Sequence, residues 1–129
     1  MQPKMRILVV DDSPQARTIL RLFLSKEGFE VITAGGVTEA LQCVQEQRPD
    51  LIITDYAMPG RSGLDLCRHL RTHGHTRHIP IVLHTGTDLP HTETALYDAV
   101  YEKPASLVQL AQRVHELLAE SKDLPPLGH

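Results

Sequence analysis

Apolar, β-branched residues gather in five short runs, separated by longer stretches in which apolar residues recur every three or four positions. The runs, at residues 6–10, 30–34, 51–54, 81–84 and 99–102, predict five strands, and the stretches between them predict helices. Strict alternation of strand and helix is typical of a parallel sheet, and right-handed crossovers leave few topologies. We therefore predict an α/β fold in which a doubly wound parallel sheet of order 2-1-3-4-5 carries helices on both faces.

Capping residues mark where the helices begin. The predicted first residues or caps of four helices are Ser13, Thr38, Gly63 and Ser106. Residues 88–98 should hold one more helix, but their pattern supports only about two turns. Residues 120–129, ESKDLPPLGH, are polar and proline-rich and are predicted to be disordered, which leaves residues 1–119 as the folded domain.

Composition narrows the function classes. A chain of 129 residues suits a single domain, and its net charge of −3 argues against binding to nucleic acid or to an anionic membrane surface. No apolar stretch approaches the roughly 20 residues that a membrane span requires. Cys43 and Cys67 lie in helix-like segments without CxxC spacing and are interpreted as small buried apolar residues. These features predict a cytoplasmic protein.

Charged and hydroxyl side chains follow four of the predicted strands. Asp11 and Asp12 follow the first strand, Asp55 the third, Thr85 the fourth and Lys103 the fifth. In a doubly wound sheet, ligands bind beyond the carboxyl ends of the strands, where the strand order reverses between strands one and three. We therefore expect these side chains to converge on one site.

Such a convergence requires positive charge. Two carboxylates about 5 Å apart repel each other by roughly 3 kcal/mol at an effective dielectric constant of 20. Lys103 supplies one positive charge, and a divalent cation would supply the rest. Oxygen ligands favour Mg²⁺, with Mn²⁺ as the alternative. Beside such a cation, a carboxylate can act as a nucleophile toward a phosphoryl group.

Four segments, ILVVDDSP, LIITDYAMPGRSG, IVLHTG and EKP, resemble in order and content the receiver domain of two-component response regulators. The resemblance covers residues 5–119 and implies a flavodoxin-like, three-layer (βα)5 sandwich. It implies that Asp55 is the phosphoacceptor, that Lys103 pairs with the phosphoryl group and that Thr85 is the switch hydroxyl. The implied metal ligands are Asp11, Asp12, Asp55 and the backbone carbonyl of Ala57, and the implied cis peptide precedes Pro104.

The resemblance also implies partners. A sensor histidine kinase or a histidine phosphotransfer protein would donate the phosphoryl group to Asp55. The domain would not be an enzyme beyond its own phosphorylation and dephosphorylation. It would act as a stand-alone domain, like chemotaxis regulators, through contacts with an output protein or with a second copy of itself, without touching nucleic acid or membrane.

The switch region departs from the family pattern. Family members carry Tyr or Phe three positions before the lysine of the last strand, where this chain has Val100. Tyr101 lies next to that position, but side chains alternate along a strand, so Tyr101 should face the opposite side. The segment between Thr85 and Lys103 is also about four residues shorter than the family's usual length. We therefore do not expect an aromatic side chain to act as a switch in this chain. We expect the surface through which it contacts its output partner to differ from that of other family members.

Two other functions remain open. A degenerate receiver would act as an interaction module without phosphorylation, although all five charged or hydroxyl positions are present. A phosphatase of the haloacid-dehalogenase kind also uses an aspartate nucleophile, but it requires an acid two residues later, where this chain has Ala57.

Histidines cluster in residues 68–78, RHLRTHGHTRH. His69 and His73 have the spacing of zinc ligands on a helix, but no cysteine or glutamate completes a set. We interpret the segment as a solvated, mildly basic helix end. His84 is predicted to pack at the edge of the core, facing away from Thr85, and the face that carries Arg17 is interpreted as ordinary solvated surface.

Overall fold

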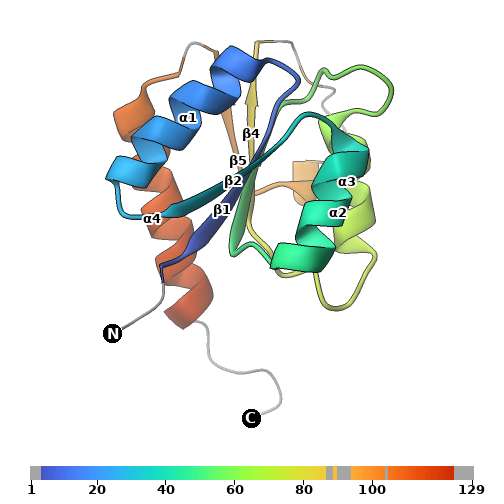
Figure 1. The fold of residues 1–129 in the computed structure, drawn as a ribbon. Coiled ribbons are helices and arrows are strands. Elements are labelled where there is room, and N and C mark those ends of the chain that lie inside the picture. The colour runs from blue at the N-terminus through green and yellow to red at the C-terminus, as the bar shows by residue number, and fades with distance from the viewer. Residues whose placement is uncertain (1–3, 87–88, 90–93, 104, 124–129) are drawn as a thin grey trace.

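The computed structural model describes residues 4–86, 89, 94–103 and 105–123. Within them, five parallel strands form one sheet in the order β2-β1-β3-β4-β5 (Figure 1). The strands are β1 (Arg6–Val10), β2 (Glu30–Ala34), β3 (Leu51–Thr54), β4 (Ile81–Thr85) and β5 (Ala99–Glu102). The predicted fold and strand order are confirmed, and β4 runs one residue beyond its predicted end to include Thr85.

Helices cover both faces of the sheet. They are α1 (Pro14–Lys26), α2 (Val37–Gln47), α3 (Gly63–Arg71) and α4 (Leu107–Asp123), with a 3₁₀ turn, η1 (Thr94–Leu96), between β4 and β5. Figure 1 shows α1 and α4 together on one side of the strands and α2 and α3 on the other. The three layers follow from the right-handed crossovers that parallel strands require.

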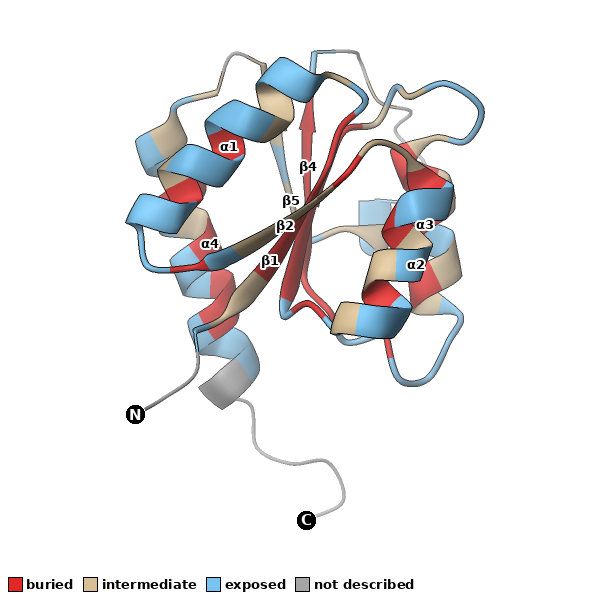
Figure 2. Ribbon diagram, in the orientation of Figure 1, coloured by how far each residue is buried: buried red, intermediate tan, exposed pale blue. Residues whose placement is uncertain are grey.

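Alternate side chains of the central strands build two separate cores. In β1, Ile7 and Val9 pack with α1 and α4, whereas Leu8 and Val10 pack with α2 and α3. The whole of β3 and β4 is buried, as the red strands at the centre of Figure 2 show. Burial on both faces explains why these strands are runs of apolar residues rather than alternating patterns.

Side-chain caps fix the starts of three helices, and at α4 the Oγ of Ser106 accepts the backbone N–H of Gln109 at 3.3 Å, as predicted. The Oγ of Ser13 accepts the backbone N–H of Ala16 at 3.2 Å, and Pro14 occupies the first turn of α1. At α3, Ser62 and Asp65 form a reciprocal capping box. Because α2 begins at Val37, after an uncapped Gly36, its predicted start at Thr38 is one residue late.

Two predicted element lengths are corrected. In place of the predicted two-turn helix between β4 and β5, the described residues hold only the three-residue turn η1. Leu96 and Tyr97 pack against the core there, but no helical repeat of apolar residues exists to bury a longer face. Conversely, α4 continues to Asp123, so part of the predicted tail is helical, because each added residue gains a backbone hydrogen bond. Residues 124–129 lie outside the described part.

The two cysteines differ in burial. Cys67 is fully buried, as predicted, and burial raises the pKa of its thiol to about 12, so it packs as an apolar side chain. Cys43 is only half-buried, contrary to the prediction. Among the helices that the structure describes, none is both long and apolar enough to cross a membrane.

The first residue of α3 lies against the end of β3. The N–H of Gly63 donates to the carbonyl of Tyr56 at 2.8 Å. A Cβ atom on Gly63 would lie only 2.2 Å from the carbonyl oxygen of Asp55. Glycine is required here because any side chain would push the helix away from the strand end.

Replacing Leu24 should destabilise the fold far more than replacing its neighbour Leu22. Leu24 is 1% exposed between α1 and the sheet, whereas Leu22 is 52% exposed on the same helix. We expect Leu24→Ala to lose about 2–5 kcal/mol of the free energy of unfolding in urea, and Leu22→Ala less than about 0.5 kcal/mol. Equal losses would contradict the assignment of the α1 core face.

Gly63→Ala tests the close contact between α3 and β3. The clash with the backbone of Asp55 should lower the free energy of unfolding by about 1–3 kcal/mol. Gly74→Ala is the matched control, since a Cβ there meets nothing within 4 Å and the backbone is not left-handed. If both variants unfold at the same urea concentration as the parent chain, the contact does not constrain the fold.

Candidate functional site

Three carboxylates meet at the carboxyl edge of the sheet. Asp11 follows β1, Asp55 follows β3, and Asp12 is next to Asp11 in the chain. One oxygen of each lies within 4.8 Å of the others. Asp11 and Asp55 are 2% and 7% exposed, whereas Asp12 is open to solvent. The structure thus brings together the acids that the strand ends predict.

The sheet itself fixes the two buried carboxylates. The N–H of Asp11 donates to the carbonyl of Ala34 at 3.1 Å, and the N–H of Asp55 donates to that of Val10 at 2.9 Å. Both residues therefore continue the hydrogen-bond ladder of the parallel strands past their last paired positions. The backbones of the two residues are thus held at fixed positions and cannot separate without breaking hydrogen bonds of the sheet.

Lys103 bridges the buried carboxylates. Its Nζ lies 2.7 Å from Oδ2 of Asp11 and 3.0 Å from Oδ2 of Asp55. Its backbone N–H donates to the carbonyl of Thr85 at 2.9 Å, which ties the lysine to the end of β4. Burial would lower the pKa of Lys103, but the hydrogen bonds that its ammonium donates to Asp11 and Asp55 outweigh burial and raise that pKa. The ammonium is therefore firmly charged.

The carboxylates fit a divalent cation. Three carboxylates with one ammonium leave a formal charge of −2. Oδ1 of Asp11 accepts the N–H of Ser13 at 2.9 Å, but Oδ1 of Asp55 is buried with no hydrogen-bond partner among the described residues. A buried carboxylate oxygen without a partner is costly, and a hard cation with oxygen ligands would satisfy it.

The other predicted site residues differ in their burial. Thr85 is buried at the end of β4, and Ala57 is exposed in the loop after β3. Val100 is 40% exposed, whereas Tyr101 packs with the α1 and α4 core, so the two face opposite sides as predicted. Pro104 lies outside the described residues, and its cis peptide stays a prediction.

Arg17 belongs to the site, contrary to its interpretation as solvated surface. Its guanidinium donates to the backbone carbonyl of Asp11 at 2.7 Å, and the side chain is half-buried. Long side chains on a helix lean toward its N-terminus, and Arg17 lies one turn after Ser13. That spacing is the signal that could have identified it. The contact holds the turn between β1 and α1.

His84 packs beside Lys103, as predicted for a histidine at the core edge. It is 8% exposed and lies with Ile19, Leu20 and Leu107 in a mostly apolar pocket of about 300 Å³. Neither ring nitrogen has a hydrogen-bond partner among the described residues. Burial, followed by the charge of Lys103, lowers the pKa of His84, so its ring stays neutral.

Comparison with known proteins agrees with the geometry. The family model of the response regulator receiver domain matches residues 7–115. The chain is 37% identical over 126 residues to the DNA-binding response regulator MtrA of Mycolicibacterium smegmatis, covering 95% of this chain and 54% of that protein. The chain thus spans about half the length of this curated relative.

Solved structures resemble the fold closely. The signal receiver domain of a histidine kinase from Syntrophus aciditrophicus superposes with a TM-score of 0.85 at 32% identity, covering 97% of this chain and 98% of that one. The response regulator protein TrrA of Thermotoga maritima, solved in complex with Mg(2+)-BeF, gives a TM-score of 0.80 at 33% identity over 88% of this chain and 98% of its own. The chain therefore belongs to the response regulator receiver domain family.

Proposed function

We propose that this receiver domain takes a phosphoryl group onto Asp55 from a histidine kinase or a histidine phosphotransfer protein. The observation that carries the proposal is the buried Asp55 carboxylate, which shares Lys103 with Asp11 and keeps one oxygen without a partner. A carboxylate that is ionised, positioned by the sheet and close to fixed positive charge is suited to attack phosphorus.

The transfer is a single displacement. A carboxylate oxygen of Asp55 forms a bond to phosphorus while the phosphorus–nitrogen bond of the donor phosphohistidine breaks. The electron pair of that bond stays on the departing imidazole, which takes up a proton from water. The product is an acyl phosphate on Asp55, held at an edge that the protein backbone makes rigid.

The residues that would hold Mg²⁺, or Mn²⁺ in its place, are Asp11, Asp12, Asp55 and the backbone carbonyl of Ala57. A divalent ion bound there would supply the positive charge that balances the acids and the phosphoryl oxygens. The formal charge of −2 and the unpartnered oxygen of Asp55 support this assignment. The complex of TrrA with Mg(2+)-BeF is consistent with it.

Lys103 and Thr85 respond to the added charge. The Lys103 ammonium, which now pairs with Asp11 and Asp55, would turn to the phosphoryl oxygens, and the Thr85 hydroxyl would donate to them. Because the backbone of Lys103 is bonded to Thr85, a shift in one moves the other. The exposed Val100 offers no aromatic ring to follow that shift, so the output surface would change through β4 and β5 themselves.

Receiver domains are signalling modules, and we propose that this one catalyses only its own phosphorylation and dephosphorylation. Its output would be contact with another protein or with a second copy of the domain, in the cytoplasm. MtrA is named as DNA-binding and is about twice as long as this chain. For residues 1–129, the absence of direct contact with nucleic acid stays a prediction that rests on the net charge of −3.

Intact mass after incubation with acetyl phosphate tests the proposal. The parent chain should gain one phosphoryl group with Mg²⁺ and none with a chelator, because the acids repel the donor without a cation. Asp55→Asn should gain none. Asp50→Asn is the matched control, since Asp50 precedes β3 whereas Asp55 follows it, and it should be modified like the parent.

A folded parent chain that gains no phosphoryl group under any of these conditions would overturn the proposal. That result would favour the degenerate receiver, which acts as an interaction module. A phosphoryl group that appears equally in Asp55→Asn would instead move the acceptor to another residue.

A further inference from the structure

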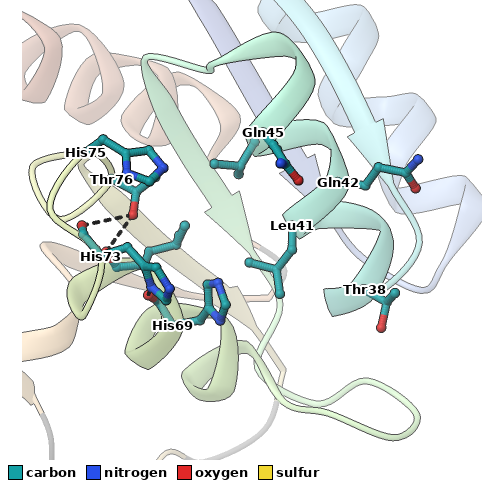
Figure 3. Close-up of a pocket in the computed structure, with 10 residues that line it drawn as sticks. Thr38, Leu41, Gln42, Gln45, His69, His73, His75 and Thr76 are labelled. Carbon is teal, nitrogen blue, oxygen red and sulfur yellow. Dashed lines mark hydrogen bonds between the residues drawn. The ribbon is translucent and has the colours of Figure 1, made fainter.

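Three histidines meet at the C-terminal end of α3, at the opposite end of this helix from Gly63. The rings of His69 and His73, one turn apart, are stacked with centroids 4.2 Å apart and planes inclined by 19°. The ring of His75 meets that of His73 edge-on, with centroids 6.5 Å apart. Figure 3 shows all three on the same side of a pocket, opposite side chains of α2.

A hydrogen bond sets the tautomer of the central ring. Nδ1 of His73 lies 2.7 Å from the backbone carbonyl oxygen of His69. A carbonyl only accepts, so Nδ1 carries the proton and, in the neutral ring, the lone pair is on Nε2. A ring N–H bonded to a backbone carbonyl is the usual arrangement behind a metal-binding histidine, because it orients the ring and increases the basicity of the other nitrogen.

The turn that carries His75 is fixed to the helix end. The buried hydroxyl of Thr76 donates to the carbonyl of Leu70 at 2.8 Å and lies 3.2 Å from the carbonyl oxygen of His73 (Figure 3). The backbone N–H of Thr76 also donates to that of His73, at 3.1 Å. The buried Thr76 side chain therefore fixes the turn that places His75 beside His73.

The surroundings of His69 favour its neutral imidazole. The histidines line a pocket of about 460 Å³ between α2 and α3, with Gln42 and Gln45 on its far side. Burial, then the neighbouring His73 and then Arg61, lowers the pKa of His69, so its ring gives up its proton more readily than an ordinary histidine. Metal binding requires neutral imidazole. The positive charge of Arg61 also opposes a bound cation, so affinity must come from the nitrogen ligands.

We propose that His69, His73 and His75 form a binding site for a divalent transition metal of the Zn²⁺, Ni²⁺ and Cu²⁺ group. Imidazole ligands suit these ions, whereas the carboxylate cluster suits Mg²⁺, so the two sites select different cations. Coordination requires the stacked rings to tilt until their free nitrogens converge. His73 and His75 are exposed and His69 is half-buried, so the rings have room to turn.

Calorimetric titration of the untagged chain with Zn²⁺, in excess Mg²⁺ to occupy the carboxylates, tests the site. One equivalent of Zn²⁺ should bind. His69→Gln, His73→Gln and His75→Gln should each weaken binding by at least about tenfold, the scale found even for outer-shell partners of metal ligands. In nuclear magnetic resonance spectra of the histidine rings, Zn²⁺ should shift Nε2 of His73 and leave its Nδ1 protonated.

His78→Gln is the matched control, because His78 is exposed in the same segment but does not line this pocket. It should bind Zn²⁺ like the parent chain. The site is overturned if the parent binds no Zn²⁺, if the three variants bind as tightly as the parent, or if His78→Gln loses as much affinity as they do. Phosphoryl transfer to Asp55 should be the same in all four variants, so the outcome is separate from the test of the carboxylate site.

Discussion

One ammonium shared by two buried carboxylates is the interaction on which the functional edge of this domain depends. Lys103 reaches Asp11 and Asp55 at 2.7 and 3.0 Å, and Asp12 adds a third negative charge beside them. The carboxylate oxygens lie within 4.8 Å of one another. Two carboxylates about 5 Å apart repel by roughly 3 kcal/mol at an effective dielectric constant of 20, and one lysine offsets only part of that repulsion. The edge therefore keeps a net negative charge, which a divalent cation would balance.

The rest of the fold supplies the rigidity that keeps such an edge together. Two aliphatic cores pack against the two faces of the sheet and hold β1 and β3 in register. Asp11 and Asp55, which follow these strands, therefore have fixed positions relative to each other. The absence of a side chain on Gly63 lets α3 approach the end of β3, and the Arg17 guanidinium ties the turn after Asp11. These contacts explain why acids that repel one another remain close without unfolding the strand ends.

The positions of functional side chains could be predicted best where they follow from the direction of the strands. The strand order follows from alternation and handedness, and residues after parallel strands must meet at one edge, so Asp11, Asp55 and Lys103 could be grouped from sequence. Contacts that depend on side-chain reach were missed. The bond from Arg17 to the backbone carbonyl of Asp11 depends on how far a long side chain reaches back along α1, and its signal is only the one-turn spacing from Ser13. The position of His75 depends on a turn anchored by Thr76, which periodicity does not describe. The end of α4 depends on local hydrogen bonding rather than on the apolar pattern, whereas η1 is short because its segment has no helical repeat of apolar residues.

The central claim is that three carboxylates with a single lysine create a cation site. The free energy of unfolding, measured with Mg²⁺ and with a chelator, tests this claim most directly. Mg²⁺ at ten times its dissociation constant should stabilise the parent chain by about 1.4 kcal/mol, since it binds only the folded state. Asp12→Asn, which removes one ligand from the exposed side of the cluster, should be at least as stable as the parent in chelator and should gain much less from Mg²⁺. A parent chain that gains nothing from Mg²⁺, or an Asp12→Asn variant that gains as much as the parent, would contradict the account.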